Sequence, residues 1–193
     1  MKKIAFLALI GVFLLTACVQ NNVQTKKITD LEDAAQQVIE IIKNKDLKSL
    51  AEYIHPNKGV RFSPYPYINT KNDIVFMPLD LKGKFSDNTD YKWGAYDGSG
   101  LPIELTFGEY FDKFVYDKDF VNAEKISLNK IIGTGNSINN IDKAYPDAQY
   151  VEFYFSGFDE QYGGMDWEAL RLVFEKYEDG FLLVGIIHAQ WTI

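Results

Sequence analysis

The chain has 193 residues, of which 47% are hydrophobic and 15% aromatic, so it is long and apolar enough to bury a substantial core. Its 20 basic and 27 acidic residues give a net charge of −7, which disfavours binding to nucleic acid or to anionic lipid head groups. One cysteine excludes a disulfide framework within the chain, and two histidines leave few ligands for a zinc site.

Residues 1–17 have the organisation of a secretory signal peptide. Lys2 and Lys3 precede an apolar stretch over residues 4–15, which is shorter than the roughly 20 residues of a membrane-spanning helix. The tetrapeptide Leu15-Thr16-Ala17-Cys18 resembles the lipobox of bacterial lipoproteins. That resemblance implies that Cys18 carries lipid acyl chains such as palmitate and becomes the first mature residue. The alternative is an ordinary cleaved signal, which leaves an unpaired exported thiol unexplained.

The rest of the chain divides into a tether and one domain. Residues 18–27 are polar and without periodicity, which predicts a lipidated cysteine followed by a flexible linker. Residues 28–193 match a single globular domain. Cleavage removes two lysines, so the mature charge is 18 minus 27, or −9. We therefore expect attachment to the extracytoplasmic face of the cell membrane through acyl chains and not through a basic surface.

Two helices are predicted first. Apolar residues recur at helical spacing from Ile28 to Asn44, and Thr29 and Glu32 form a capping-box pattern at the start. A second, shorter helix is predicted after Asp46, which can cap it, and Pro56 ends it.

Strands become more frequent later in the chain. Strands are predicted over residues 59–65, 91–96, 123–132 and 150–155, and a capping box at Thr106 and Glu109 predicts a further helix through Phe114. Early helices and late strands favour an α+β fold, with N-terminal helices packed on a curved antiparallel sheet that ends in a long C-terminal β-hairpin.

The predicted hairpin spans residues 170–193. With Asp179 and Gly180 as the two loop residues, Arg171 faces His188 and Glu175 faces Val184. A three-residue loop with a bulge would shift the register by one, and Arg171 and His188 would remain neighbours. The face that carries these polar groups lines a pocket or contacts solvent.

A family resemblance covers nearly the whole mature chain. It is carried by three motifs: His55-Pro56-x-x-Gly59-Val60-Arg61-Phe62-Ser63-Pro64-Tyr65, Tyr96-Asp97-Gly98-Ser99-Gly100, and Gly185-Ile186-Ile187-His188-x-Gln190-Trp191-Thr192-Ile193. These resemble a family of uncharacterised bacterial lipoproteins. The order of elements resembles the nuclear-transport-factor-2-like, cone-shaped fold. The resemblance implies a location and a fold, with a pocket inside the curved sheet, but no catalytic residues.

Candidate ligand-binding residues are Arg61, Arg171, Glu175 and His188, because each interrupts an otherwise apolar strand. An exposed salt bridge between Arg171 and Glu175 is the alternative interpretation. No catalytic set, metal site or cofactor is expected. The Asp117-Lys118-Asp119 segment lacks the later ligands of a calcium loop, and a Ser127-x-x-Lys130 match lacks its helical context.

Two functions remain open at this stage. The first is a non-catalytic extracytoplasmic module that binds a small ligand or an envelope protein. The second is a small acid–base enzyme of the ketosteroid-isomerase-like type that uses His188 or an acidic neighbour. Whether His188 points into a cavity or into packed side chains would separate them.

Overall fold

The computed structural model describes residues 23–26 and 28–192. The predicted signal peptide, Cys18 and most of the predicted tether lie outside this part of the chain. Within the described residues, no helix is both long and apolar enough to cross a membrane.

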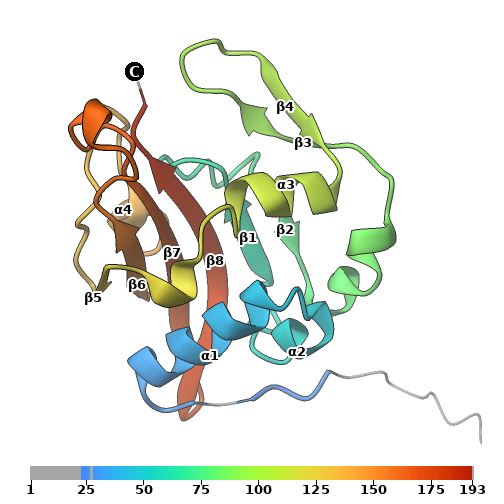
Figure 1. The fold of residues 1–193 in the computed structure, drawn as a ribbon. Helices are drawn as coiled ribbons and strands as arrows, with labels where there is room; N and C mark the ends of the chain where they lie inside the picture. Colours follow the sequence, from blue (N-terminus) through green and yellow to red (C-terminus); the bar gives the residue numbers. More distant parts are fainter. Residues whose placement is uncertain (1–22, 27, 193) are drawn as a thin grey trace, which may run out of the picture.

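A six-stranded sheet organises the domain, in the order β2-β1-β8-β7-β6-β5 (Figure 1). Its strands are β1 (Val60–Ser63), β2 (Val75–Phe76), β5 (Lys125–Leu128), β6 (Gln149–Phe155), β7 (Glu168–Tyr177) and β8 (Gly180–Gln190). Neighbouring strands are antiparallel, except that β1 runs parallel to β8. The predicted α+β class and the long terminal hairpin are confirmed, and the parallel pair is an addition to the antiparallel sheet that the sequence predicts.

The helices begin where side chains satisfy their first backbone N–H groups. They are α1 (Leu31–Lys43), α2 (Leu47–Ala51), α3 (Phe107–Phe114) and α4 (Ile141–Ala144), with 3-10 turns η1 (Pro78–Leu81), η2 (Lys84–Ser86), η3 (Phe120–Asn122) and η4 (Glu160–Tyr162). The predicted capping box at Thr106 and Glu109 is present, and Asp46 caps α2. The box predicted at Thr29 is wrong: Asp30 caps α1, because Ile28 bridges to Phe181 and α1 starts only at Leu31.

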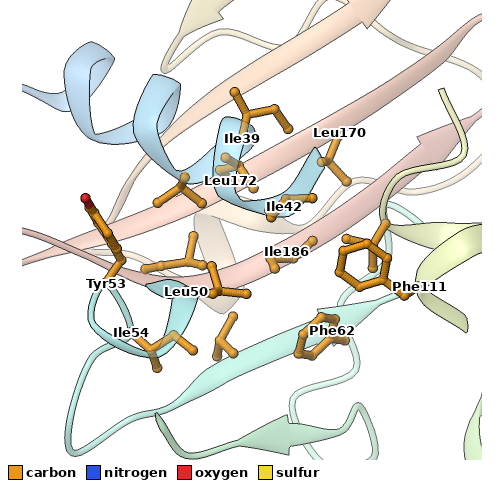
Figure 2. Close-up of a cluster of buried hydrophobic side chains, with 14 of the residues drawn as sticks. Ile39, Ile42, Leu50, Tyr53, Ile54, Phe62, Phe111, Leu170, Leu172 and Ile186 are labelled. Atoms are coloured by element: carbon orange, nitrogen blue, oxygen red, sulfur yellow. The ribbon is translucent and has the colours of Figure 1, made fainter. Parts of the chain in front are cut away.

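The main core lies between one face of the sheet and the helices. Figure 2 shows α1 residues Ile39 and Ile42 close to Leu170, Leu172 and Ile186 of the hairpin. All five are almost completely buried. Burying one such side chain contributes about 1.5–3 kcal/mol, so this contact accounts for much of the attachment of α1.

The register of the hairpin differs from the predicted one. Tyr177 pairs with Gly180, so the loop residues are Glu178, which has a φ of 52°, and Asp179. A register shift opposite Val173 and Phe174 then adds a β-bulge. As a result Arg171 pairs with Ile187, and His188 pairs with Leu170. Because side chains alternate along a strand, Arg171 and His188 lie on opposite faces of the sheet, and the predicted contact between them is wrong.

The second face of the sheet is also covered. Val173, Val184 and Ile187 pack there against Ile68 and Ile141 in a separate apolar cluster. Near the chain's end, Trp167, Ala169 and Ala189 form a third cluster. The sheet is therefore buried on both sides, unlike a sheet with one solvated face.

A two-stranded hairpin, β3 (Tyr91–Ala95) and β4 (Pro102–Leu105), stands apart from the main sheet (Figure 1). The register shifts between Lys92 and Gly94, and the intervening Trp93 is buried. Its indole ring stacks on Tyr110 of α3 with ring centroids 3.7 Å apart, and its Nε1 donates to the Leu105 carbonyl oxygen. These contacts fix the hairpin to the body of the domain.

Candidate functional site

Arg171, one of the four predicted binding residues, forms a buried ion pair. Its Nε donates to Glu152 Oε2 at 2.5 Å, and the two side chains are 1% and 0% exposed. Glu152 is the cross-strand neighbour of Arg171 on β6. Its other oxygen, Oε1, accepts from the backbone N–H groups of Ile132 and Gly133 at 2.7 and 2.9 Å. Arg171 Nη2 donates to the Gly133 carbonyl oxygen at 2.9 Å, so the pair holds residues 132–133 against the sheet.

Glu175 and Arg61 lie on the same face as Arg171 but have other partners. Glu175 pairs with Lys58, so the predicted salt bridge between Arg171 and Glu175 is wrong. Arg61 lies on β1, which β8 separates from β7, and its Nη1 donates to the Asp73 carbonyl oxygen at 3.1 Å. The three residues therefore share a face without forming one site.

His188 belongs to a different cluster, on the core face of the sheet. Its Nε2 lies 3.4 Å from Asp117 Oδ1 and 3.9 Å from Glu168 Oε2. The ring of Phe114 packs nearly perpendicular to the imidazole, with ring centroids 5.6 Å apart. The imidazole is completely buried. Lys118 Nζ lies 2.8 Å from the other oxygen of Glu168. When both carboxylates are ionised and His188 is protonated, the four charges sum to zero.

The electrostatics of this cluster favour a protonated His188. Burial disfavours the imidazolium, but the two carboxylates more than offset burial and raise the pKa of His188 to about 9. Burial also opposes ionisation of Asp117, yet His188 and Glu168 hold the pKa of Asp117 below its usual range. For Glu168 burial dominates, and its pKa is raised. The separations to His188 exceed normal hydrogen-bond lengths, so we describe the contacts as ion pairs.

The same three side chains could ligate a metal ion. The ligand atoms of Asp117, Glu168 and His188 all lie within 4.8 Å of one another. The sequence predicts no metal site, because it has two histidines and one cysteine and no pair of them at metal-ligand spacing. The ammonium of Lys118 already contacts Glu168 and neutralises charge that a divalent cation would need, so the cluster fits a charge-balanced ion network better than a metal centre.

An open groove lies beside the β3–β4 hairpin and has a volume of about 1080 Å³. Its walls come from residues 64–73, from β3 and the turn after it, and from residues 136–138. Aromatic residues contribute the apolar part of the walls: Tyr65, Tyr67, Trp93 and Tyr96. The groove also contains two lysines and two aspartates, Lys71, Lys92, Asp73 and Asp97, whose charges balance. A second cavity, of about 120 Å³, lies next to Arg171 and Trp167.

Several residues of these sites are absent from the candidate residues that the sequence predicts. Glu152 interrupts an aromatic strand, and a carboxylate in such a strand is a signal that could have identified it. The sequence pattern at Asp117 indicates only the start of a calcium loop. In the structure Asp117 contacts His188, whereas Asp119 accepts from Tyr116 and Asn122. Asp117 therefore belongs to the buried His188 cluster, whereas Asp119 binds groups outside that cluster.

The geometry defines an α+β protein with a sheet covered on both faces and an open polar–aromatic groove beside it. No protein-family model matches the chain, and no curated protein matches it.

Two solved structures are similar in part. One is described as a calcium/calmodulin-dependent protein kinase II association domain from Xanthomonas campestris, with 10% identity, a TM-score of 0.33, and coverage of 89% of this chain and 96% of that one. The other is a variant named Rd1NTF2_05, with 14% identity, a TM-score of 0.28, and coverage of 82% and 99%. The α+β assignment rests on this chain's own strands and helices.

Proposed function

We propose that the protein is a membrane-anchored extracytoplasmic lipoprotein whose domain is a non-catalytic module that binds a small ligand. The observation that carries the binding function is the open groove of about 1080 Å³ beside the β3–β4 hairpin. Ligand sites are concave, combine apolar and aromatic walls with a few polar groups, and have volumes of about 300–1,000 Å³. A small ligand fits these dimensions better than an envelope protein, which would need a larger surface.

The composition of the groove indicates the kind of ligand. Tyr67 is 56% exposed and lines the groove, and Tyr65 and Tyr96 add further aromatic area. Because the positive charges of the lysines and the negative charges of the aspartates in the walls sum to zero, the groove has little net electrostatic attraction for a strongly charged ligand. A neutral polar ligand with a flat or ring-shaped face suits the groove best.

The anchoring rests on the sequence. The tetrapeptide ending at Cys18 supports lipidation, and the predicted mature charge of −9 leaves the acyl chains as the means of attachment. The tether over residues 18–27 would place the groove a short distance outside the membrane. The resemblance to uncharacterised bacterial lipoproteins, with a nuclear-transport-factor-2-like fold, is part of this proposal.

An acid–base enzyme of the ketosteroid-isomerase-like type has less support. Such an enzyme needs its acid or base within reach of the substrate. His188 is 0% exposed, and it does not line the groove or the cavity next to Arg171. The His188 cluster is better explained as a buried ion network.

A ligand-detected NMR screen of the whole chain, with neutral ring-containing compounds such as short glycans, tests the binding function. We expect at least one compound to bind, and Tyr67→Ala to weaken it about tenfold or more through lost stacking. Tyr162→Ala is the matched control, because Tyr162 is also a half-exposed tyrosine, 50% accessible, and is absent from the groove. Equal binding by both variants would overturn the assignment of the groove.

A further inference from the structure

The small cavity next to Arg171 and Trp167 is lined by two side chains that each carry a buried donor without a partner. It has a volume of about 120 Å³ and is lined by Arg171, Trp167, Thr134 and Gln190, among others. Arg171 Nη1 and Trp167 Nε1 have no hydrogen-bond partner within the described part of the chain. The two side chains are 1% and 5% exposed. Buried donors of this kind are costly when unpaired, so an acceptor in the cavity would stabilise both.

The guanidinium is held so that Nη1 stays available. Arg171 uses Nε for Glu152 and Nη2 for the Gly133 carbonyl oxygen. Glu152 cannot turn toward Nη1 without breaking its bonds to the backbone of residues 132–133. The available donor is therefore a fixed part of the fold, and little ordering is needed when a ligand binds.

The indole of Trp167 is fixed as well. A Cβ at position 133 would lie 2.5 Å from Trp167 Cζ3, and one at position 135 would lie 3.4 Å from Cζ2. The ring therefore packs flat against two glycines. Trp93, in contrast, already donates its Nε1 proton to Leu105.

We propose that this cavity binds the carboxylate group of a small ligand. The two available groups are donors only, so a cation or a second donor is disfavoured. Carboxylate oxygens accept hydrogen bonds from a guanidinium more strongly than neutral oxygens do. The volume equals that of about four water molecules, which suits a carboxylate with one or two attached carbons. Ser137 lines both this cavity and the groove, but the proposal rests on the two donors and not on the groove.

Titration of the whole chain with sodium acetate at constant ionic strength tests the proposal. The readout is the indole N–H signals of ¹⁵N-tryptophan, and Trp167→Phe assigns the signal of Trp167. We expect that signal to shift saturably, with a dissociation constant of about 1–10 mM for so small a ligand. The Trp93 signal should stay in place, because its N–H is already bonded.

Substitutions in the cavity and a neutral analogue of acetate test whether the guanidinium of Arg171 and the charge of the ligand are needed for binding. Arg171→Lys keeps the positive charge but removes the planar guanidinium group with its several N–H donors, so it should weaken acetate binding at least about tenfold. Arg61→Lys is the control, because Arg61 lies outside the cavity. If Arg171→Lys does not fold, Gly135→Ala serves instead, since its Cβ would lie 3.9 Å from Trp167 Nε1 and narrow the site. Absence of a saturable shift, unchanged affinity in both Arg171→Lys and Gly135→Ala, or binding of acetamide as tight as that of acetate would overturn the proposal.

Discussion

Arg171 and His188 point to opposite faces of one hairpin, because Arg171 pairs with Ile187 and His188 pairs with Leu170. The two residues share no partner: Arg171 contacts Glu152 and Gly133, whereas His188 contacts Asp117 and Glu168. The hairpin thus places one buried charged group in each layer of the protein. Substitutions of Arg171 and of His188 should therefore affect the free energy of unfolding independently of each other.

We expect the effects of Arg171→Met and His188→Gln on the free energy of unfolding to be additive within about 0.5 kcal/mol. Denaturant titration of the two single variants and the double variant measures this. Arg171→Met combined with Glu152→Gln is the positive control for coupling, because those side chains are in contact. A coupling energy above about 1 kcal/mol between Arg171 and His188 would contradict the observed register.

Loss of the buried ion pair should be far more costly than loss of an exposed one. Arg171→Ala leaves Glu152 buried without its cation and should cost about 3–5 kcal/mol in unfolding free energy. Lys58→Ala removes the partner of Glu175 at a half-exposed site and should cost less than about 1 kcal/mol. Equal losses in the two denaturant titrations would show that burial does not determine the strength of these pairs.

His188 should make stability fall as pH rises from about 6.5 to about 9. Its pKa is raised to about 9 in the folded protein, so in this window the folded state holds more protons than the unfolded state. The contribution is complete below the unfolded value and is lost as pH passes the folded one. The pKa of His55, by contrast, is lowered mainly by burial, so its effect lies below this window.

Thermal or denaturant unfolding across this pH range measures the slope. The groups that face His188 are Asp117 and Glu168, with Lys118 next to them. His188→Gln should reduce the loss of unfolding free energy between about pH 6.5 and about pH 9, whereas His55→Gln should leave that loss unchanged. A wild-type profile that is flat or rising between these pH values would contradict the ion network.

Two neighbouring glycines should respond differently to alanine. At Gly133 a Cβ would lie 2.5 Å from the Trp167 ring, and overpacking of this kind costs about 1–3 kcal/mol. At Gly135 the closest approach is 3.4 Å, an ordinary contact, so Gly135→Ala should change stability by less than about 1 kcal/mol. Denaturant midpoints of the two variants decide the point, and a Gly135→Ala loss as large as that of Gly133→Ala would argue against the flat packing of Trp167.

Lipidation at Cys18 is predicted from the tetrapeptide at residues 15–18. Mass spectrometry of membrane-extracted protein should show a lipid-modified N-terminus at Cys18, and Cys18→Ala should leave the precursor uncleaved by the lipoprotein peptidase. Recovery of an unmodified soluble mature form from wild-type cells would rule lipidation out. Ser99→Ala, at an exposed turn, is the control variant, and it should be lipidated and cleaved as the wild-type protein is.

Local features were predictable from the sequence because their causes lie within a few residues. The capping box of Thr106 and Glu109, the cap at Asp46 and the existence of the terminal hairpin all follow from neighbouring side chains and backbone geometry. The α+β class follows in the same way from the order of helical and strand patterns.

Only the tertiary structure decided which polar groups meet. The one-residue shift of the loop by itself would leave Arg171 and His188 on the same face, whereas the bulge opposite Val173 and Phe174 adds one residue to β8 and moves His188 to the other face. Glu152 meets Arg171 because β6 pairs with β7, and Asp117 meets His188 because the segment after α3 packs over the sheet. Such contacts depend on which distant segments pair with each other. Burial of the whole core determines that pairing, and a pattern within a few neighbouring residues does not encode it.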